Sequence, residues 1–160
     1  MSRRGGQSGF SMIELMVVIS ILGVLARLSM PVLASMRRDA IAADVAGDFN
    51  VIRAAAVAQY EATGSYPADG ATGQAPPGMA PFLPRGFSFT KKDYQLDWEH
   101  WVVADSTGGA QVDYVLAVTV VAPDETLQRQ LLVTLGRNCT HWSVDDASTF
   151  VVLSSLEAGH

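Results

Sequence analysis

The chain has an unbroken apolar run near its start, followed by a segment in which apolar residues recur at regular steps. From Phe10 to Ala26 every residue except Glu14 is uncharged, and most are apolar. Farther on, apolar residues recur at steps of three or four, the spacing of one helix face. They are Ile41, Val45, Phe49, Ile52, Ala56 and Tyr60. The two patterns predict one helix from Phe10 to about Thr63, first membrane-spanning and then amphipathic.

The expected helix is longer than a bilayer is thick. About 54 residues at 1.5 Å each would give roughly 80 Å, against a hydrocarbon core of about 30 Å. We therefore assign residues 10–33 to a transmembrane half and residues 34–63 to an amphipathic half that packs on a globular head. Pro31 lacks a backbone N–H and clashes with the preceding turn, so we expect a helix kink or a locally melted turn there. Gly64 suits the C-terminal end of the helix.

Residues 64–160 are expected to form the head, beginning with an ordered loop and two strands. Proline and glycine are too frequent over residues 64–86 for a regular element. Alternating apolar and polar residues predict a strand over Tyr94–Trp98, which residues 101–104 extend. After a turn supplied by residues 106–109, the β-branched run Val112–Val121 predicts the second strand.

A short helix is expected after the second strand. Asp124 is a candidate N-cap, and Gly136 closes the segment. A strand over residues 128–135 remains the alternative. The helix is favoured because leucines recur every four residues, at Leu127, Leu131 and Leu135.

The chain is expected to end in a β-hairpin. Its strands would be residues 141–144 and 149–153, around the polar turn 145–148, with a frayed tail over residues 157–160. The predicted fold class is therefore α+β, with a long N-terminal helix packed on a small antiparallel β-sheet.

Charge and cysteine content narrow the class of protein. The formal net charge is −5 at pH 7, and loss of residues 1–9 with their two arginines would leave about −7. An acidic product argues against a nucleic-acid binder that neutralises phosphates, and Lys91-Lys92 is the only basic pair in the expected head. Cys139 is the single cysteine, so an intrachain disulfide is excluded.

Glu14 is the most unusual residue of the apolar run. A carboxylate within a membrane helix is costly and usually marks a function, so we expect Glu14 to have a partner. The leader, residues 1–9, contains Arg3-Arg4 and ends in Gly9, directly before Phe10. Gly9, Phe10 and Glu14 at this spacing resemble the class III signal of type IV pilins and type II secretion pseudopilins. The stretch Tyr60-x-x-x-Gly64-x-Tyr66-Pro67 is similar to the end of the long helix in major pseudopilins.

The resemblance implies a route of processing and assembly. A prepilin peptidase would cleave between Gly9 and Phe10, and the new N-terminus at Phe10 would be methylated. Glu14 would pair with the amine of a neighbouring subunit as the chain enters a helical filament. The leader would be cytoplasmic before cleavage, and one inner-membrane helix would hold the head in the periplasm. The implied partners are other pilin-like subunits, the peptidase, an inner-membrane assembly platform and the lipid bilayer, with no nucleic acid.

The function we favour is that of a structural subunit of a type II secretion pseudopilus, which drives protein transport across the outer membrane. Many type IV pilins staple a C-terminal loop with two cysteines, and this chain has one. A type IV pilin or minor pilin, acting in adhesion, motility or DNA uptake, is the close alternative. A membrane-anchored periplasmic enzyme or binding module is a second alternative, but no catalytic motif is present, so we expect no enzyme.

The other candidate sites have ordinary structural interpretations. His100, His141 and Cys139 could be neighbours, but Cys-x-His is too sparse for a zinc site with four ligands. Some major pseudopilins bind calcium near the C-terminal loop, which makes Asp145 and Asp146 a calcium candidate. Calcium takes six to eight oxygen ligands, so an ordinary turn is favoured and no other cofactor is expected.

Two further features are interpreted as packing and membrane anchoring. The three tryptophans are expected to pack in the core or at a sheet edge rather than to form a ligand platform; they are Trp98, Trp101 and Trp142. Arg27 departs from the pilin-like pattern. Extension of its side chain toward the outer membrane interface is favoured over pairing with an acidic neighbour.

Overall fold

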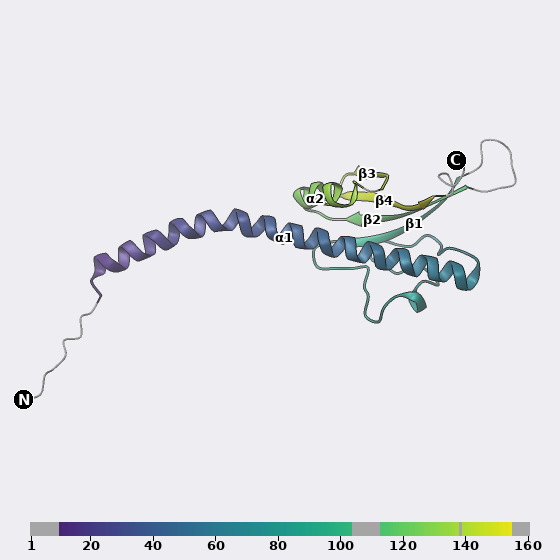
Figure 1. Cartoon of the computed structure of the whole chain (residues 1–160), viewed down its shortest axis with the longest axis horizontal. Helices are drawn as coiled ribbons and strands as arrows, with labels where there is room; N and C mark the ends of the chain where they lie inside the picture. Colours follow the sequence, from purple (N-terminus) through teal and green to yellow (C-terminus); the bar gives the residue numbers. More distant parts are fainter. Residues whose placement is uncertain (1–9, 104–112, 138, 155–160) are drawn as a thin grey trace, which may run out of the picture. The chain divides into compact units, whose positions relative to one another are not determined.

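The chain folds into two helices, a short 3₁₀ helix and four strands, shown in a computed structural model that describes residues 10–103, 113–137 and 139–154 (Figure 1). In chain order they are α1 (Met12–Thr63), η1 (Ala80–Phe82), β1 (Gln95–Val103), β2 (Asp113–Val121), α2 (Glu125–Leu135), β3 (His141–Val144) and β4 (Ala147–Ser154). The chain divides into two compact units, residues 1–37 and residues 38–160. They are called the N-terminal unit and the head unit below.

α1 confirms the predicted long helix. It begins at Met12, two residues later than expected, and ends at Thr63. Gly64 follows with φ of 76°, and its N–H donates to the Tyr60 carbonyl at 2.8 Å. Glycine adopts this left-handed backbone without the steric cost that other residues meet, which explains why the helix ends here.

The four strands form one antiparallel sheet in the order β1-β2-β4-β3. Trp98 of β1 lies opposite Val118 of β2, which in turn lies opposite Phe150 of β4. The register of β2 and β4 shifts between Leu116 and Ala117. The predicted turn over residues 106–109, the predicted frayed tail and the strand ends at Ala104 and Val112 lie outside the described residues.

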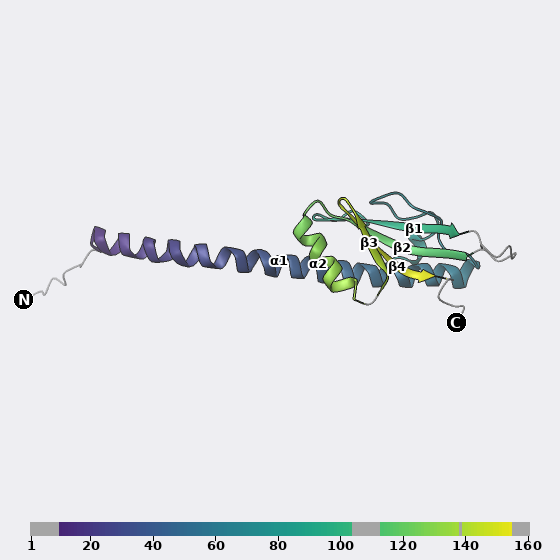
Figure 2. The same cartoon turned by 90° about the horizontal axis from the view of Figure 1, so that it is seen from above.

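The core of the head unit lies between the sheet and the 38–63 part of α1, which runs along one face of the sheet (Figure 2). Of the apolar face predicted for this helix, Val45, Ile52 and Ala56 are fully buried, and Ile41 and Phe49 are partly buried. Tyr60 is the exception, because it is 45% exposed and stacks on Tyr66 with ring centroids 4.4 Å apart.

Strand residues that alternate along β1, β2 and β4 fill the other side of this core. Its fully buried members include Leu96, Trp98, Leu116, Val118, Val120 and Phe150. Burying one large apolar side chain contributes about 1.5–3 kcal/mol, so this layer is the main stabilising contact of the head unit. Trp98 also donates its indole N–H to the Pro67 carbonyl at 3.2 Å.

α2 is a helix, so the strand considered for residues 128–135 is not formed. Asp124 is its N-cap, as predicted, and accepts from the N–H groups of Thr126 at 2.9 Å and Leu127 at 3.4 Å. Leu127 and Leu131 are buried in the core. This helix packs beside β4.

The loop over residues 64–86 contains η1 and lines the outer edge of β1. The N–H of Gly70 donates to the Trp98 carbonyl at 3.1 Å, and that of Gly73 donates to the Leu96 carbonyl at 2.8 Å. Gly73 has φ of 78°, and an added Cβ would lie 2.6 Å from the Thr90 hydroxyl. The glycine-rich composition therefore allows the loop to approach the strand closely.

Candidate functional site

The candidate site lies at the start of α1, where the sequence places the processing and assembly residues. Gly9 lies outside the described residues. Phe10 is 83% exposed and lies two residues before Met12, the first residue of the helix. Glu14 lies in the first turn of α1. The cleavage at Gly9-Phe10, the methylation of Phe10 and the assembly role of Glu14 stay predictions.

Glu14 and Ser11 exchange two hydrogen bonds at this end of the helix. The Ser11 N–H donates to Glu14 Oε2 at 2.8 Å, and the Glu14 N–H donates to Ser11 Oγ at 3.3 Å. The reciprocal pair is a capping box, in which two otherwise unpaired helix donors are satisfied by side chains. The sequence contains the arrangement Ser-x-x-Glu, but this cap was not predicted. The partner predicted for Glu14 was the amine of a neighbouring subunit.

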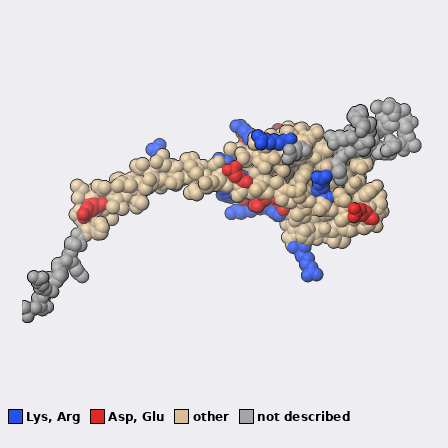
Figure 3. Space-filling view, viewed as in Figure 1, with Lys and Arg blue, Asp and Glu red and all other residues tan. Residues whose placement is uncertain are grey.

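The N-terminal unit exposes a continuous apolar surface. All its described residues, 10–37, are solvent-exposed, and Glu14 and Arg27 are the only charged residues between Phe10 and Met36. Figure 3 shows that charged side chains are sparse on this stretch and frequent on the head unit. Among the described residues, α1 is long and apolar enough to cross a membrane, and none of its most apolar window is buried.

Pro31 and Arg27 lie within this apolar stretch. The helix assignment continues on both sides of Pro31, so the locally melted turn is not seen, and the kink stays a prediction. Arg27 is exposed, which fits a side chain that reaches toward a membrane interface. The choice between that interpretation and pairing with an acidic neighbour stays open.

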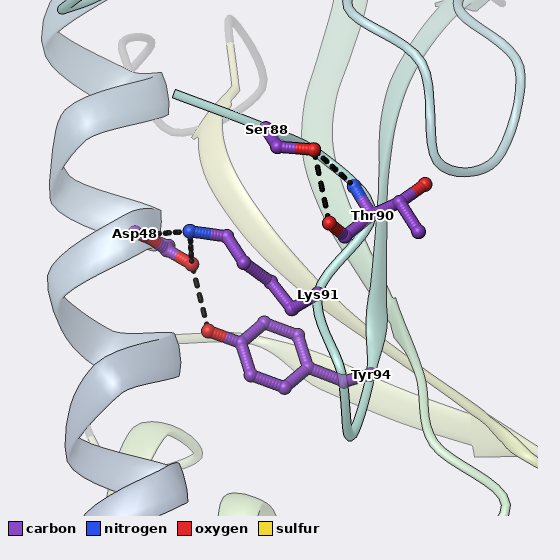
Figure 4. A network of polar contacts seen from close by, with 5 residues as sticks. All are labelled: Asp48, Ser88, Thr90, Lys91 and Tyr94. Atoms are coloured by element: carbon purple, nitrogen blue, oxygen red, sulfur yellow. Dashed lines mark hydrogen bonds and ion pairs between the residues drawn. The ribbon is translucent and has the colours of Figure 1, made fainter. Parts of the chain in front are cut away.

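A polar network in the head unit joins α1 to the segment before β1 (Figure 4). Lys91 Nζ lies 3.1 Å from Asp48 Oδ1 and 3.0 Å from Oδ2. The Tyr94 hydroxyl donates to Asp48 Oδ2 at 2.7 Å. Lys91 Nζ also lies 4.8 Å from the centre of the Phe87 ring, which provides a cation–π contact. The network therefore holds α1 against the segment that leads into β1.

Burial raises the pKa of the Tyr94 hydroxyl, and its hydrogen bond to Asp48 raises it further. Tyr94 stays protonated and remains a donor across the physiological range. This network was not predicted from the sequence, because Asp48 lies more than 40 residues from both partners.

The histidines and the cysteine do not form a metal site in the part of the chain that the structure describes. His100 Nδ1 lies 2.8 Å from the Pro67 carbonyl, whereas His141 Nδ1 lies 3.1 Å from the Cys139 carbonyl. No group of three potential metal-ligating residues was found among the described residues. Burial raises the pKa of the Cys139 thiol, so this thiol is a weaker nucleophile at neutral pH than a free cysteine.

Asp145 and Asp146 form the turn between β3 and β4, within the turn predicted over residues 145–148. Both are exposed, Asp145 has φ of 51°, and the Asp146 carbonyl accepts from the Ala122 N–H at 2.9 Å. An aspartate tolerates this left-handed backbone better than most residues do. The turn explains both residues without a ligand, and calcium binding there stays a prediction.

The tryptophans divide between the two faces of the sheet. Trp98 is fully buried. Trp101 and Trp142 contact each other with ring centroids 5.5 Å apart, and Trp142 is 41% exposed. The contact between Trp101 and Trp142 is therefore explained by side-chain packing.

Comparison with known proteins identifies the N-terminal segment. The prokaryotic N-terminal methylation motif matches residues 4–26, a range that includes Gly9, Phe10 and Glu14. No curated protein and no solved structure matches the chain significantly. The motif implies processing by a prepilin peptidase and assembly with other pilin-like subunits.

Motif and fold also agree on the coarse nature of the protein. A class III leader followed by one apolar helix fits a single-pass, membrane-anchored protein. Both suggest a structural subunit rather than an enzyme. The chain carries a class III leader ahead of a pilin-like α+β fold, a leader typical of type IV pilins and pseudopilins.

Proposed function

We propose that this chain is a structural subunit of a type II secretion pseudopilus, a filament that drives protein export across the outer membrane. In this proposal the N-terminal unit lies in the inner membrane before assembly and in the filament core afterwards. The head unit lies in the periplasm. A prepilin peptidase releases residues 1–9, and methylation follows at Phe10.

The observation that carries the proposal is an exposed apolar helix with one carboxylate in its first turn. Residues 10–37 are exposed throughout, and a surface this apolar needs lipid or other helices around it. Glu14 then sits in a medium where an unpaired charge is costly. A neighbouring N-terminal amine supplies the opposite charge, so pairing favours subunits held side by side.

Three features support a pseudopilus over a type IV pilus. Cys139 is the single cysteine of the chain, so the disulfide-stapled loop of many type IV pilins cannot form. The Tyr66-Pro67 stretch after α1 is similar to that of major pseudopilins. The chain is also acidic, at −5 for the full sequence.

Mass spectrometry of the chain from cells with an active prepilin peptidase tests the processing step. The expected product begins at a methylated Phe10. Gly9→Leu places a bulky side chain before the cleaved bond and is expected to leave only the precursor. A native product that begins at Met1 would overturn the proposal.

Substitution of Glu14 tests the assembly step. Glu14→Ala is expected to be inserted and processed like the wild type but to enter filaments at about one-tenth of its level or less, because the neighbouring amine loses its partner. Cysteine cross-linking between neighbouring helices measures incorporation per processed subunit. Glu61→Ala is the matched control, since Glu61 is an exposed carboxylate near the other end of α1. Equal incorporation of both variants would contradict the assembly role.

Deletion of the gene separates the two kinds of filament. A pseudopilus subunit is expected to be needed for the release of folded exoproteins into the medium. Loss of twitching motility or DNA uptake with normal protein export would instead identify a type IV pilin or minor pilin.

A further inference from the structure

Two tryptophans and a glutamate lie together on the face of the sheet that points away from the core. Glu99 and Trp101 alternate along β1 with the fully buried Trp98, so their side chains point to the outer face. Trp142 of β3 reaches the same face, because its indole contacts that of Trp101 with ring centroids 5.5 Å apart. Packing explains this contact, yet Trp142 stays 41% exposed, and Val144, two residues farther along β3, is 64% exposed. The outer face therefore offers an aromatic surface to a partner.

Hydrogen bonds hold the Glu99 carboxylate on this outer face. The Thr119 hydroxyl of β2 donates to Glu99 Oε1 at 3.0 Å, and it lies 2.9 Å from the Thr149 hydroxyl of β4. Thr149 lies directly opposite Trp142 in the ladder of β3 and β4, and opposite residues share one face of a sheet. No hydrogen bond of Glu99 Oε2 is found in the part of the chain that the structure describes. This oxygen is therefore available to a donor beside the two indoles.

The charges around Glu99 favour a cation. Burial raises the pKa of Glu99, the hydrogen bond from Thr119 opposes the rise, and the charges of Asp97 and Asp69 add to it. A carboxylate with acidic neighbours is relieved by an approaching positive charge. The whole chain also carries a net charge of −5, so copies of its head repel one another and a basic partner is attracted.

We propose that this surface binds a segment of a basic partner protein that presents an arginine side chain. The surface is called the indole patch below and consists of Glu99, Trp101, Trp142 and Val144. A guanidinium is planar, so it stacks on the Trp142 indole while its N–H groups donate to the Glu99 carboxylate. Tryptophan and arginine are also enriched among the residues that contribute most to protein interfaces. The patch lies in the head unit and is separate from the assembly contact proposed for Glu14.

A pair of matched peptides tests the proposal on the full chain in micelles of an uncharged detergent. The probe is acetyl-Gly-Arg-Gly-amide, and the control is the same peptide with citrulline, which has the shape of arginine without its charge. The arginine peptide is expected to shift the indole N–H resonances of Trp101 and Trp142 and to leave that of the buried Trp98 in place. The citrulline peptide is expected to bind about fivefold more weakly or less. Equal binding of the two peptides would overturn the proposal.

Variants of the chain separate the patch from a general attraction to an acidic head. Glu99→Gln removes the charge but keeps an oxygen that accepts from Thr119, and it is expected to weaken binding of the arginine peptide about fivefold or more. Trp142→Leu keeps an apolar side chain and is expected to weaken it by a similar factor. Glu125→Gln is the matched control, since the Glu125 side chain is 85% exposed on α2, and it should stay within about twofold of the wild type. Equal losses for Glu99→Gln and Glu125→Gln would contradict the role of the patch.

Other occupants of the indole patch would give different results. A partner held only by apolar contacts would bind acetyl-Gly-Leu-Gly-amide as well as the arginine peptide. A second copy of the head would appear in sedimentation as self-association of the wild-type chain that Glu99→Gln abolishes. Either result would overturn the proposal of a basic partner.

Discussion

Two aspartates of the head unit have pKa values moved in opposite directions by their surroundings. Hydrogen bonds from the backbone of Thr126, and also of Leu127, lower the pKa of Asp124. Burial raises the pKa of Asp97, a nearby Asp69 charge raises it further, and a hydrogen bond from Thr72 opposes the rise. Ionised Asp124 therefore stabilises the fold, whereas ionisation of Asp97 destabilises it.

The N-cap of α2 is expected to give a pH-dependent contribution to stability. Because the folded-state pKa of Asp124 is lowered, its contribution is present above the unfolded pKa and is lost as the pH falls through the folded value. Asp124→Ala is expected to lower the free energy of unfolding at pH 7, and the difference from the wild type should shrink toward about pH 2. Denaturant unfolding at several pH values measures it.

Asp124→Asn is the control for this prediction. Asparagine caps a helix about as well as aspartate, but it does not titrate. The asparagine variant should retain most of the stability at pH 7. An alanine variant as stable as the asparagine variant at pH 7 would contradict the role of the cap.

The roles of residues that depend only on their neighbours in the sequence could be predicted. Asp124 and Gly64 were identified correctly because a cap or a terminator depends only on the residues beside it. The contact of Asp48 with Lys91 and Tyr94 could not be predicted, because no local pattern specifies which distant side chains the fold brings together.

At the scale of elements, the join between α1 and the sheet has an apolar layer and a polar clamp. The apolar layer could be foreseen in part, since Val45 and Ile52 follow the helical period and are fully buried. Buried Gln59 was missed because it is polar. The polar clamp is formed by Asp48, Lys91 and Tyr94.

The hydroxyl of Tyr94 is expected to stabilise this join. Tyr94→Phe removes the 2.7 Å hydrogen bond to Asp48 and keeps the ring, so it should lower the free energy of unfolding of the head by about 1–3 kcal/mol. Tyr60→Phe is the matched control, because Tyr60 is 45% exposed. Equal stability of the two variants in denaturant unfolding would contradict the contribution of the clamp.

α2 shows why helix and strand were difficult to distinguish in one segment. Leu127, Leu131 and Leu135 repeat every four residues, yet β-branched Val133 and Thr134 also suit a strand. The cap at Asp124 and the burial of Leu127 and Leu131 favour the helix. The N-cap and the buried leucines both favour a helix, and together they outweigh the preference of the β-branched residues for a strand.

At the scale of the whole molecule, the hydrophobic core belongs to one unit. All residues of the core cluster lie between Ile41 and Val152, within the head unit. The described part of the N-terminal unit buries no side chain of its own. We therefore expect the head unit to fold without the apolar segment.

A fragment that comprises residues 38–160 is expected to fold by itself and to stay soluble in water. Circular dichroism should show helix and strand together, with one cooperative thermal transition. The full chain in detergent micelles is the reference, and its head should unfold at a similar temperature. A fragment without a cooperative transition would show that the apolar helix is needed for folding.

The loop that covers the outer edge of β1 affects how this strand can pair with strands of other molecules. Backbone N–H groups of Gly70 and Gly73 occupy the carbonyls of Trp98 and Leu96, and Asp69 accepts from the His100 N–H at 3.1 Å. A strand from another molecule cannot pair with β1 between Leu96 and His100, because these backbone groups already have partners. In the filament proposed above, this part of β1 would therefore not pair with a strand of a neighbouring head, as edges do in amyloid.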